Sequence, residues 1–292
     1  MKKIYAILFS ISIITTLIAG YFLINHGLKL GVDFKGGSVI ELQYSENRPE
    51  VGVISKALEV SKVQGVSVTP SGDKDLIIRS ATLNEDQHQQ VLNSLKAIND
   101  KFTEKRFDSI GPSLGEELRS NSVIGIAVLI GVIMLYISIV FRTMGRVISP
   151  WAMGVAALFA LIHDVIISLG IFSFLGFYYG VEISAVYVAV ALTILSYSIS
   201  DTVVVFDRVR ENIIRFGGRD SFLILVHKSI LQTLTRSINS SMTTILALLA
   251  IYIFGGESIK FFAMALIIGI ALGTYSSIFV ASPVLMWWGA RK

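Results

Sequence analysis

Four ionisable residues of this sequence fall in apolar stretches, where a charged side chain is costly. His163 and Asp164 are neighbours in one stretch, Asp201 lies in the next, and Arg236 stands at the start of the one after that. Insertion scales put a charge at the centre of a membrane-spanning helix at roughly 2.5 to 3.5 kcal/mol. Each of these residues is therefore a candidate for binding or moving an ion.

Asp201 and Arg236 each belong to a stripe of polar residues at helical spacing. Side chains four residues apart lie on the same face of a helix. The stripe of Asp201 contains Thr193, Ser196, Tyr197 and Ser200, and that of Arg236 contains Asn239, Ser240, Thr243 and Thr244. We expect the two stripes to face each other and the two charges to pair.

The expected pair of Asp201 and Arg236 has two possible roles. Protonation of the carboxylate would release the guanidinium and change the packing of the helices, which describes a proton-operated switch. The alternative is a static buried pair that fixes helix register. His163 and Asp164 likewise form either a proton relay or a structural hydrogen-bonded pair, and the sequence leaves both open.

Other kinds of chemistry have little support in the sequence. It contains no cysteine, so thiol nucleophiles and thiolate metal sites are absent. His26, His88, His163 and His227 are too dispersed to predict a metal site. An intramembrane enzyme built on the His163–Asp164 pair would need a nucleophile or metal ligands at matching depth, and none is found. We expect no catalytic residue, no cofactor and no metal.

The elements that would position these residues are membrane helices. Hydrophobic residues make up 53% of the sequence and charged residues only 16%. A bilayer core needs about 20 apolar residues as a helix. Six stretches qualify, at 4–24, 123–141, 148–172, 183–206, 237–254 and 261–285. The first follows two lysines but lacks a small-residue cleavage pattern, so we interpret it as a retained anchor.

The distribution of basic residues predicts the orientation of these spans. Loops rich in Lys and Arg stay in the cytoplasm. With the N-terminus inside, the inner segments carry Lys2, Lys3, Arg142, Arg146, Arg208, Arg210, Arg215, Arg219, Lys228, Arg236, Arg291 and Lys292, whereas the short outer loops carry only Lys260. Both termini are then cytoplasmic, and the segment 25–120 is external.

The external segment shows alternating strand and helix patterns. Strands are predicted at 38–44, 66–69, 76–79 and 107–110, and helices at 49–61 and 84–102. Asn84 and Gln87 have the spacing of a capping box. The order βαββαβ predicts a ferredoxin-like α+β domain.

The predicted fold class is thus an α-helical polytopic membrane protein with six transmembrane helices and one ferredoxin-like external domain between the first two. The parts are a first transmembrane helix at 1–24, the external domain at 25–120 and a five-helix domain at 121–292. The connection 207–235 mixes apolar and basic residues. It predicts an amphipathic helix on the inner membrane surface, or one packed on the helix ends.

Several glycines have expected structural roles. Gly269 and Gly273 lie four residues apart in the sixth span and offer a smooth strip on which another helix can approach closely. The segment 31–37, with Asp33, Gly36 and Gly37, lacks the strand-then-helix context of a phosphate loop. We interpret it as a tight structural turn.

Several motifs of the sequence, in order along nearly the whole chain, resemble the SecF proteins of the SecD/SecF family, in the resistance-nodulation-division superfamily. They are GVDFKGG at 31–37, GPSLGEEL at 111–118 with Gly111 and Pro112, HDV at 163–165, YSISDTVVVFDRVREN at 197–212, TRSIN at 235–239 and GTYSSIFVASP at 273–283.

The resemblance implies a subunit that, with SecD, uses the proton motive force to promote late preprotein export through the SecYEG channel. Asp201 and Arg236 match by motif the family's intramembrane aspartate and arginine tied to proton passage. Ser200 departs from the pattern, since asparagine is expected there. A separate SecD chain is the expected partner, with YajC and YidC as further candidates. The alternatives are a lipid or small-molecule exporter of the same superfamily and a non-energised assembly factor.

Overall fold

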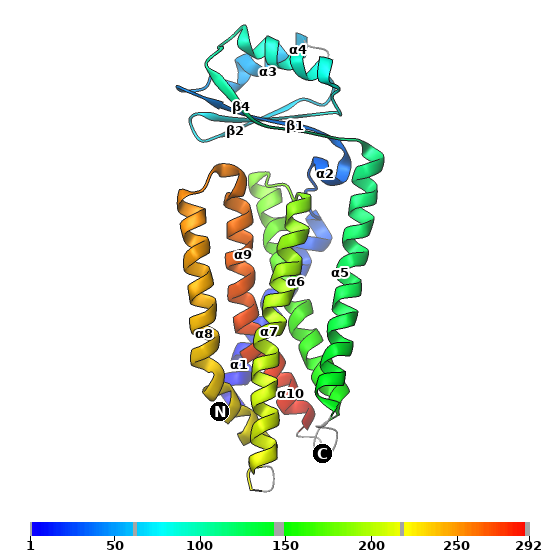
Figure 1. The fold of residues 1–292 in the computed structure, drawn as a ribbon, viewed down its shortest axis with the longest axis vertical. Coiled ribbons are helices and arrows are strands. Elements are labelled where there is room, and N and C mark those ends of the chain that lie inside the picture. The colour runs from blue at the N-terminus through cyan, green and yellow to red at the C-terminus, as the bar shows by residue number, and fades with distance from the viewer. Residues whose placement is uncertain (1, 61–62, 143–148, 217–218, 290–292) are drawn as a thin grey trace. The chain divides into compact units, whose positions relative to one another are not determined.

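The computed structural model describes residues 2–60, 63–142, 149–216 and 219–289. The chain divides into two compact units, each drawn in Figure 1. The helical unit comprises Met1–Lys29, Ile124–Val181 and Val186–Lys292, and the sheet unit comprises Leu30–Val123 with Glu182–Ala185. Of the basic residues used to predict orientation, Arg146, Arg291 and Lys292 lie outside the described residues.

Long apolar helices form the helical unit. Within the described residues, six helices are long and apolar enough to cross a membrane, which confirms the predicted polytopic fold. They are α1 (Lys2–His26), α5 (Pro112–Val140), α6 (Pro150–Tyr179), α7 (Ala185–Phe216), α8 (Phe222–Phe254) and α9 (Glu257–Ser276), the last continued by the π-helical turn η2 (Ser277–Ala281) and α10 (Ser282–Gly289).

Three helix boundaries differ from the predictions. Helix α5 begins at Pro112, well before the apolar stretch, because proline is well suited to the first helical position. Helix α7 runs on to Phe216, and α8 already begins at Phe222. The prediction of a separate amphipathic helix within 207–235 is therefore wrong. Its apolar residues Leu225, Val226 and Ile230 are buried in the core of the helical unit.

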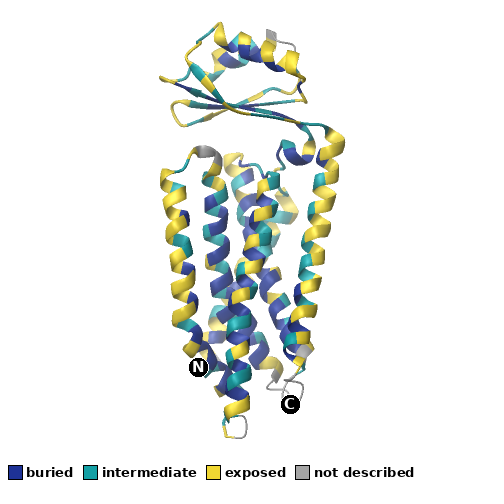
Figure 2. Ribbon diagram, viewed as in Figure 1, coloured by how far each residue is buried: buried dark blue, intermediate teal, exposed yellow. Residues whose placement is uncertain are grey.

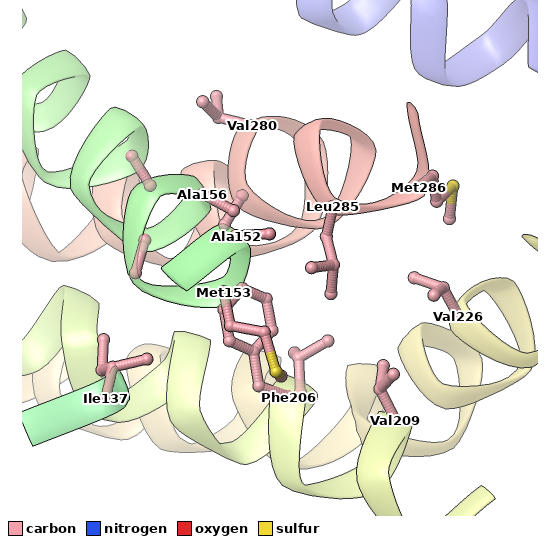
Figure 3. Packing of buried hydrophobic residues seen from close by; sticks show 14 of the residues in the cluster. Ile137, Ala152, Met153, Ala156, Phe206, Val209, Val226, Val280, Leu285 and Met286 are labelled. Carbon is pink, nitrogen blue, oxygen red and sulfur yellow. The ribbon is translucent and has the colours of Figure 1, made fainter. Parts of the chain in front are cut away.

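Apolar side chains pack at the end of the helical unit where α7, α8 and α10 meet (Figure 3). Phe206 of α7 is fully buried, and its ring makes an edge contact with Phe141, with ring centres 6.1 Å apart. Outward-facing apolar residues stay exposed along α1, α5 and α8 (Figure 2), as Phe254 does with 86% of its surface accessible. Such apolar outer surfaces suit a lipid environment.

The sheet unit has the predicted ferredoxin-like order of elements. It consists of β1 (Gly37–Tyr44), α3 (Val51–Val60), β2 (Ser67–Ser71), β3 (Asp75–Ser80), α4 (Glu85–Lys96) and β4 (Phe102–Ile110). The strands form an antiparallel sheet in the order β2-β3-β1-β4. The inward residues of β1, Ile40, Leu42 and Tyr44, are buried in a core shared with α3 and α4.

Two local predictions in the sheet unit have different outcomes. Asn84 and Gln87 form the predicted capping box, each side chain accepting a hydrogen bond from the backbone N–H of the other. The second helix, however, ends at Lys96 instead of 102, and β4 begins at Phe102 instead of 107. Phe102 packs against the core and pairs with Tyr44 of β1, so the strand starts there.

Candidate functional site

Asp164 is the most deeply buried carboxylate of the helical unit, with 0% of its surface exposed. Its Oδ2 atom accepts a hydrogen bond from Ser198 of α7 at 2.6 Å and another from Ser276 of α9 at 2.7 Å. Hydrogen bonds to an ionised group are shorter and stronger than neutral ones. One carboxylate oxygen of α6 therefore joins three helices.

His163 is bonded to the aspartate that follows it. Its Nδ1 atom lies 2.9 Å from Oδ1 of Asp164, while its Nε2 atom is buried and has no hydrogen-bond partner among the described residues. The imidazole ring stacks on Tyr275, whose hydroxyl donates to the backbone carbonyl of Leu8. With Nδ1 protonated, Nε2 carries a lone pair that could receive a proton.

Asp201 lies three residues after Ser198 on α7 and is 8% exposed. Its Oδ1 atom accepts a hydrogen bond from Ser237 of α8 at 3.1 Å, and its Oδ2 atom has no partner within the described chain. Beside it, Ser241 of α8 is hydrogen-bonded to Thr274 of α9. Buried hydroxyls thus bind two carboxylates, Asp164 on α6 and Asp201 on α7.

The glycines of α9 allow this close arrangement. A Cβ atom on Gly269 would stand 2.1 Å from Cδ1 of Ile194, and one on Gly273 would stand 2.9 Å from Cβ of Ser198. The first contact would force the Ile194 side chain to move, and the second would push against the backbone of α7 at Ser198. The small-residue strip expected from the sequence therefore receives a helix of the same chain.

Asp201 and Arg236 do not form the expected ion pair. No ion pair within 4.0 Å joins them in the described structure, and Arg236 is exposed, as is Asn239. Ser237 faces Asp201 instead, because successive residues of a helix point about 100° apart. The two predicted stripes meet at Tyr197, whose hydroxyl lies 3.3 Å from that of Ser240.

Sequence reasoning missed the hydroxyls that bind the two carboxylates. They are Ser198, Ser237 and Ser276, with Ser241 and Thr274 beside them. On α7 the residues that face inward are Ser198, Asp201, Thr202 and Val205, at the spacing of one helix face. That spacing could have indicated Ser198, whereas the predicted stripe residues Thr193, Ser196 and Ser200 are exposed.

The glycine-rich segment before β1 forms a one-turn helix, α2 (Val32–Lys35), rather than a simple turn. Gly36 and Gly37 follow it with φ values of 78° and 133°, which disfavour other residues. A Cβ on Gly36 would lie 2.7 Å from Cα of Pro112. Asp33, 7% exposed, accepts a hydrogen bond from the N–H of Ala185 at 2.6 Å. Gly111 adjoins Pro112, so the motif glycines and Asp33 lie together.

Two family models match the chain. The one described as "Protein export membrane protein SecD/SecF, C-terminal" matches residues 90–291, and the one described as "SecD/SecF GG Motif" matches residues 21–47. The second match contains Asp33, Gly36 and Gly37.

Curated relatives named "Protein translocase subunit SecF" cover most of the chain. That of Thermobaculum terrenum is 39% identical over 279 residues, which cover 91% of this chain and 86% of the relative. That of Haemophilus influenzae is 33% identical over 292 residues, covering 99% and 86% respectively.

Crystal structures of SecDF also resemble this one. SecDF from Thermus thermophilus matches with a TM-score of 0.83 and 33% identity, over 98% of this chain. SecDF in a "Super-membrane-facing form" matches with a TM-score of 0.69. This chain spans only 38% of the length of either SecDF chain. With its two family models, its curated relatives and its fold in agreement, the chain belongs to the SecD/SecF family of protein export membrane proteins.

Proposed function

We propose that this protein is a subunit of the Sec protein translocase that couples the proton motive force to late-stage preprotein export. The observation that carries the proposal is the pair of buried carboxylates, Asp164 and Asp201, each of which accepts hydrogen bonds from hydroxyls of neighbouring helices. Buried ionisable residues inside membrane helices mark ion pathways and proton relays.

The two carboxylates have different roles in this proposal. Asp164 has a hydroxyl pair on one oxygen and His163 on the other, so its hydrogen-bonding capacity is well used. Asp201 has one oxygen bonded to Ser237 and the other without a partner among the described residues. Asp201 is therefore the residue that takes up and releases the proton. Protonation changes its carboxyl group from a pure acceptor to a donor, which alters the contact between α7 and α8.

The exposed polar stripe of α8 supports a partner chain within the membrane. Arg236, Asn239 and Thr243 are exposed on α8, a helix that is long and apolar enough to cross a membrane. Polar groups left facing lipid are costly, so another membrane protein covers them. A carboxylate is the natural partner of the Arg236 guanidinium. We propose SecD as this partner, as the SecF relatives and SecDF structures suggest. SecYEG, YajC and YidC are further proposed partners.

The proposed location is the bacterial cytoplasmic membrane. Both termini would be cytoplasmic, and the sheet unit, at about 25–120 in the sequence, would lie on the outer side. The helical part at 121–292 would carry the proton path. The distribution of Lys and Arg supports this orientation.

The test replaces Asp201 by asparagine. The amide is nearly isosteric and still accepts a hydrogen bond from Ser237, but it cannot bind and release a proton. We expect Asp201→Asn protein to accumulate and co-purify with SecD, while gradient-dependent export into membrane vesicles is lost. Asp207→Asn is the matched control, because Asp207 is an exposed carboxylate on the same helix, bonded to Arg210. Export by Asp201→Asn protein at the wild-type rate under a proton gradient would reject the proposal.

A further inference from the structure

We infer that Asp33 is a positioning residue that couples movement of α7 to the sheet unit. The inference rests on the proposed function, in which α7 responds to the protonation of Asp201. A movement of α7 could be transmitted to the sheet unit through the first residue of this helix. Helix α7 begins at Ala185, and the segment Glu182–Ala185 belongs to the sheet unit.

Asp33 holds the first residue of α7. Its Oδ2 atom accepts the backbone N–H of Ala185 at 2.6 Å, and the side chain is buried. The first N–H groups of a helix have no partner within the helix, and a negative charge at this end is favoured by the helix dipole. A buried charged acceptor on a different segment therefore binds the start of α7 firmly.

The residues just before α7 are attached to the same segment and to the sheet. The N–H of Gly31 donates to the carbonyl of Ile183 at 2.9 Å, and Leu30 forms a parallel β-bridge with Ile183. Arg79 of β3 pairs with Glu182 at 2.9 Å. Three of the four residues from 182 to 185, namely Glu182, Ile183 and Ala185, are thus bonded to other parts of the sheet unit by backbone and side-chain contacts.

The chain between Asp33 and strand β1 is short and closely packed. Helix α2 ends at Lys35, one residue, Gly36, follows, and β1 begins at Gly37. Gly36 is packed against Pro112, and a Cβ on Gly115 of α5 would lie 2.9 Å from the backbone nitrogen of Gly36. Because this packing leaves no room for a side chain, a displacement of Asp33 passes directly to the central strand β1.

Helix α7 is built to transmit such a displacement. Its sequence from Ala185 to Phe216 contains neither glycine nor proline, the usual causes of kinks. Asp201 lies sixteen residues from Ala185, or about 24 Å along the axis at 1.5 Å per residue. A shift or tilt of α7 at Asp201 should therefore displace Ala185, and with it Asp33, because the helix between them has no residue at which it would readily bend.

The test measures hydrogen–deuterium exchange in the full chain with SecD in proteoliposomes, with and without a proton gradient. In wild-type protein, peptides of β1 (37–44) and of α7 around 198–205 should both change their exchange rate when the gradient is applied. In Asp33→Ala protein, the response of α7 should remain, whereas the response of β1 should fall at least fivefold. Asp33→Asn should restore most of it, because the amide oxygen still accepts the N–H of Ala185. Asp73→Ala, at an exposed turn of the same unit, is the matched control.

The outcomes separate the two proposals. A β1 response of wild-type size in Asp33→Ala protein would overturn the coupling role of Asp33 and leave the proposed function intact. An α7 that does not respond to the gradient in wild-type protein, together with unimpaired export by Asp201→Asn protein, would overturn both. If Asp33→Ala protein does not accumulate, Ala185→Pro decides, since it removes the N–H that Asp33 accepts, at the first helical position, where proline is well tolerated. A β1 response reduced at least twofold supports the inference, and an unchanged one overturns it.

Discussion

Gly273 of α9 lies so close to Ser198 of α7 that a methyl group on the glycine would stand 3.0 Å from the serine Cα and 2.9 Å from its Cβ. The backbones of the two helices therefore approach to a distance that only glycine permits at this position. This approach allows Ser198 and Ser276, three residues beyond Gly273, to bond the same oxygen of Asp164.

Gly273→Ala should therefore destabilise the helical unit. Inserting a methyl group into a packed core costs typically about 1 to 3 kcal/mol, and here it would also lengthen the bonds to Asp164. The measurement is the midpoint of unfolding in detergent. Gly125→Ala in α5 is the control, because a Cβ there meets nothing within 4 Å. Alanine should be neutral or slightly stabilising at that position. Equal midpoints for the two variants would contradict the close-approach argument.

Ser198 and Ser276 should show a cooperative effect when both are removed. Either single alanine substitution leaves one hydroxyl on Oδ2 of Asp164, so each should cost about 1 kcal/mol. The double variant leaves that buried oxygen without a donor and should cost more than the sum of the single losses. Ser196→Ala is the control, since this exposed hydroxyl bonds only its own helix. Strict additivity in a double-mutant cycle would show that the two bonds act independently.

Arg236→Ala should affect assembly more than stability. The side chain is exposed and makes no ion pair in the described residues, so the free energy of unfolding of the isolated chain should change by less than about 0.5 kcal/mol. Co-purification with SecD and gradient-dependent export should both fall. Arg236→Lys should be intermediate, because it keeps the charge but loses the planar fork that binds a carboxylate with two bonds. Arg219→Ala, at another exposed position, is the control. A large loss of stability in Arg236→Ala would place its main role within this chain.

The stability of the first turn of α4 should decrease at acidic pH because of Glu85. Hydrogen bonds from Gln89 and then from His88 lower the pKa of the Glu85 carboxyl group below its ordinary value of 4.5. Because the folded-state pKa is lower than the unfolded one, the carboxylate stabilises the fold above pH 4.5, and this contribution is lost as pH falls through the folded-state pKa. Amide exchange in α4 should therefore speed up below that range. Glu85→Gln should remove this part of the pH dependence, and an unchanged profile would refute the assignment.

Hydropathy was sufficient to find the membrane helices, because each span needs a long apolar run. The helix ends were harder to predict, since they follow local packing and backbone bonding rather than hydropathy. Residues 112–122 are largely polar, yet they continue α5 without a break from Pro112. Likewise, the first residues of α8 include charged side chains, but Val226 and Ile230 pack into the core. The helix therefore includes this segment and begins at Phe222.

The cost of a buried charge pointed to Asp164, Asp201 and His163, and the structure buries all three. It could not show which neighbours satisfy them. Serine is common in membrane helices, and only its spacing from Asp201 on one helix face favours Ser198, which bonds Asp164, over Ser200, which is exposed. Arg236 and Ser237 are adjacent in sequence but point in different directions. The predicted polar stripe of α8 was centred on Arg236, one residue away from Ser237, which is the residue that bonds Asp201.

The π-helical turn η2 sets the phase between the two halves of the sixth span. Its five residues contain one more per turn than an α-helix would place there, and the hydroxyl of Ser282 bonds the carbonyl of Ser277 across it at 2.7 Å. An α-helix over the same five residues would turn the chain further than this wider turn does, and α10 would be rotated by roughly 100° relative to α9. Leu285 and Met286 would then leave the core that they now fill. Unlike a regular α-helix, this stretch takes up one additional residue, and it thereby keeps both Ser276 and Leu285 on the side that is buried in the helical unit.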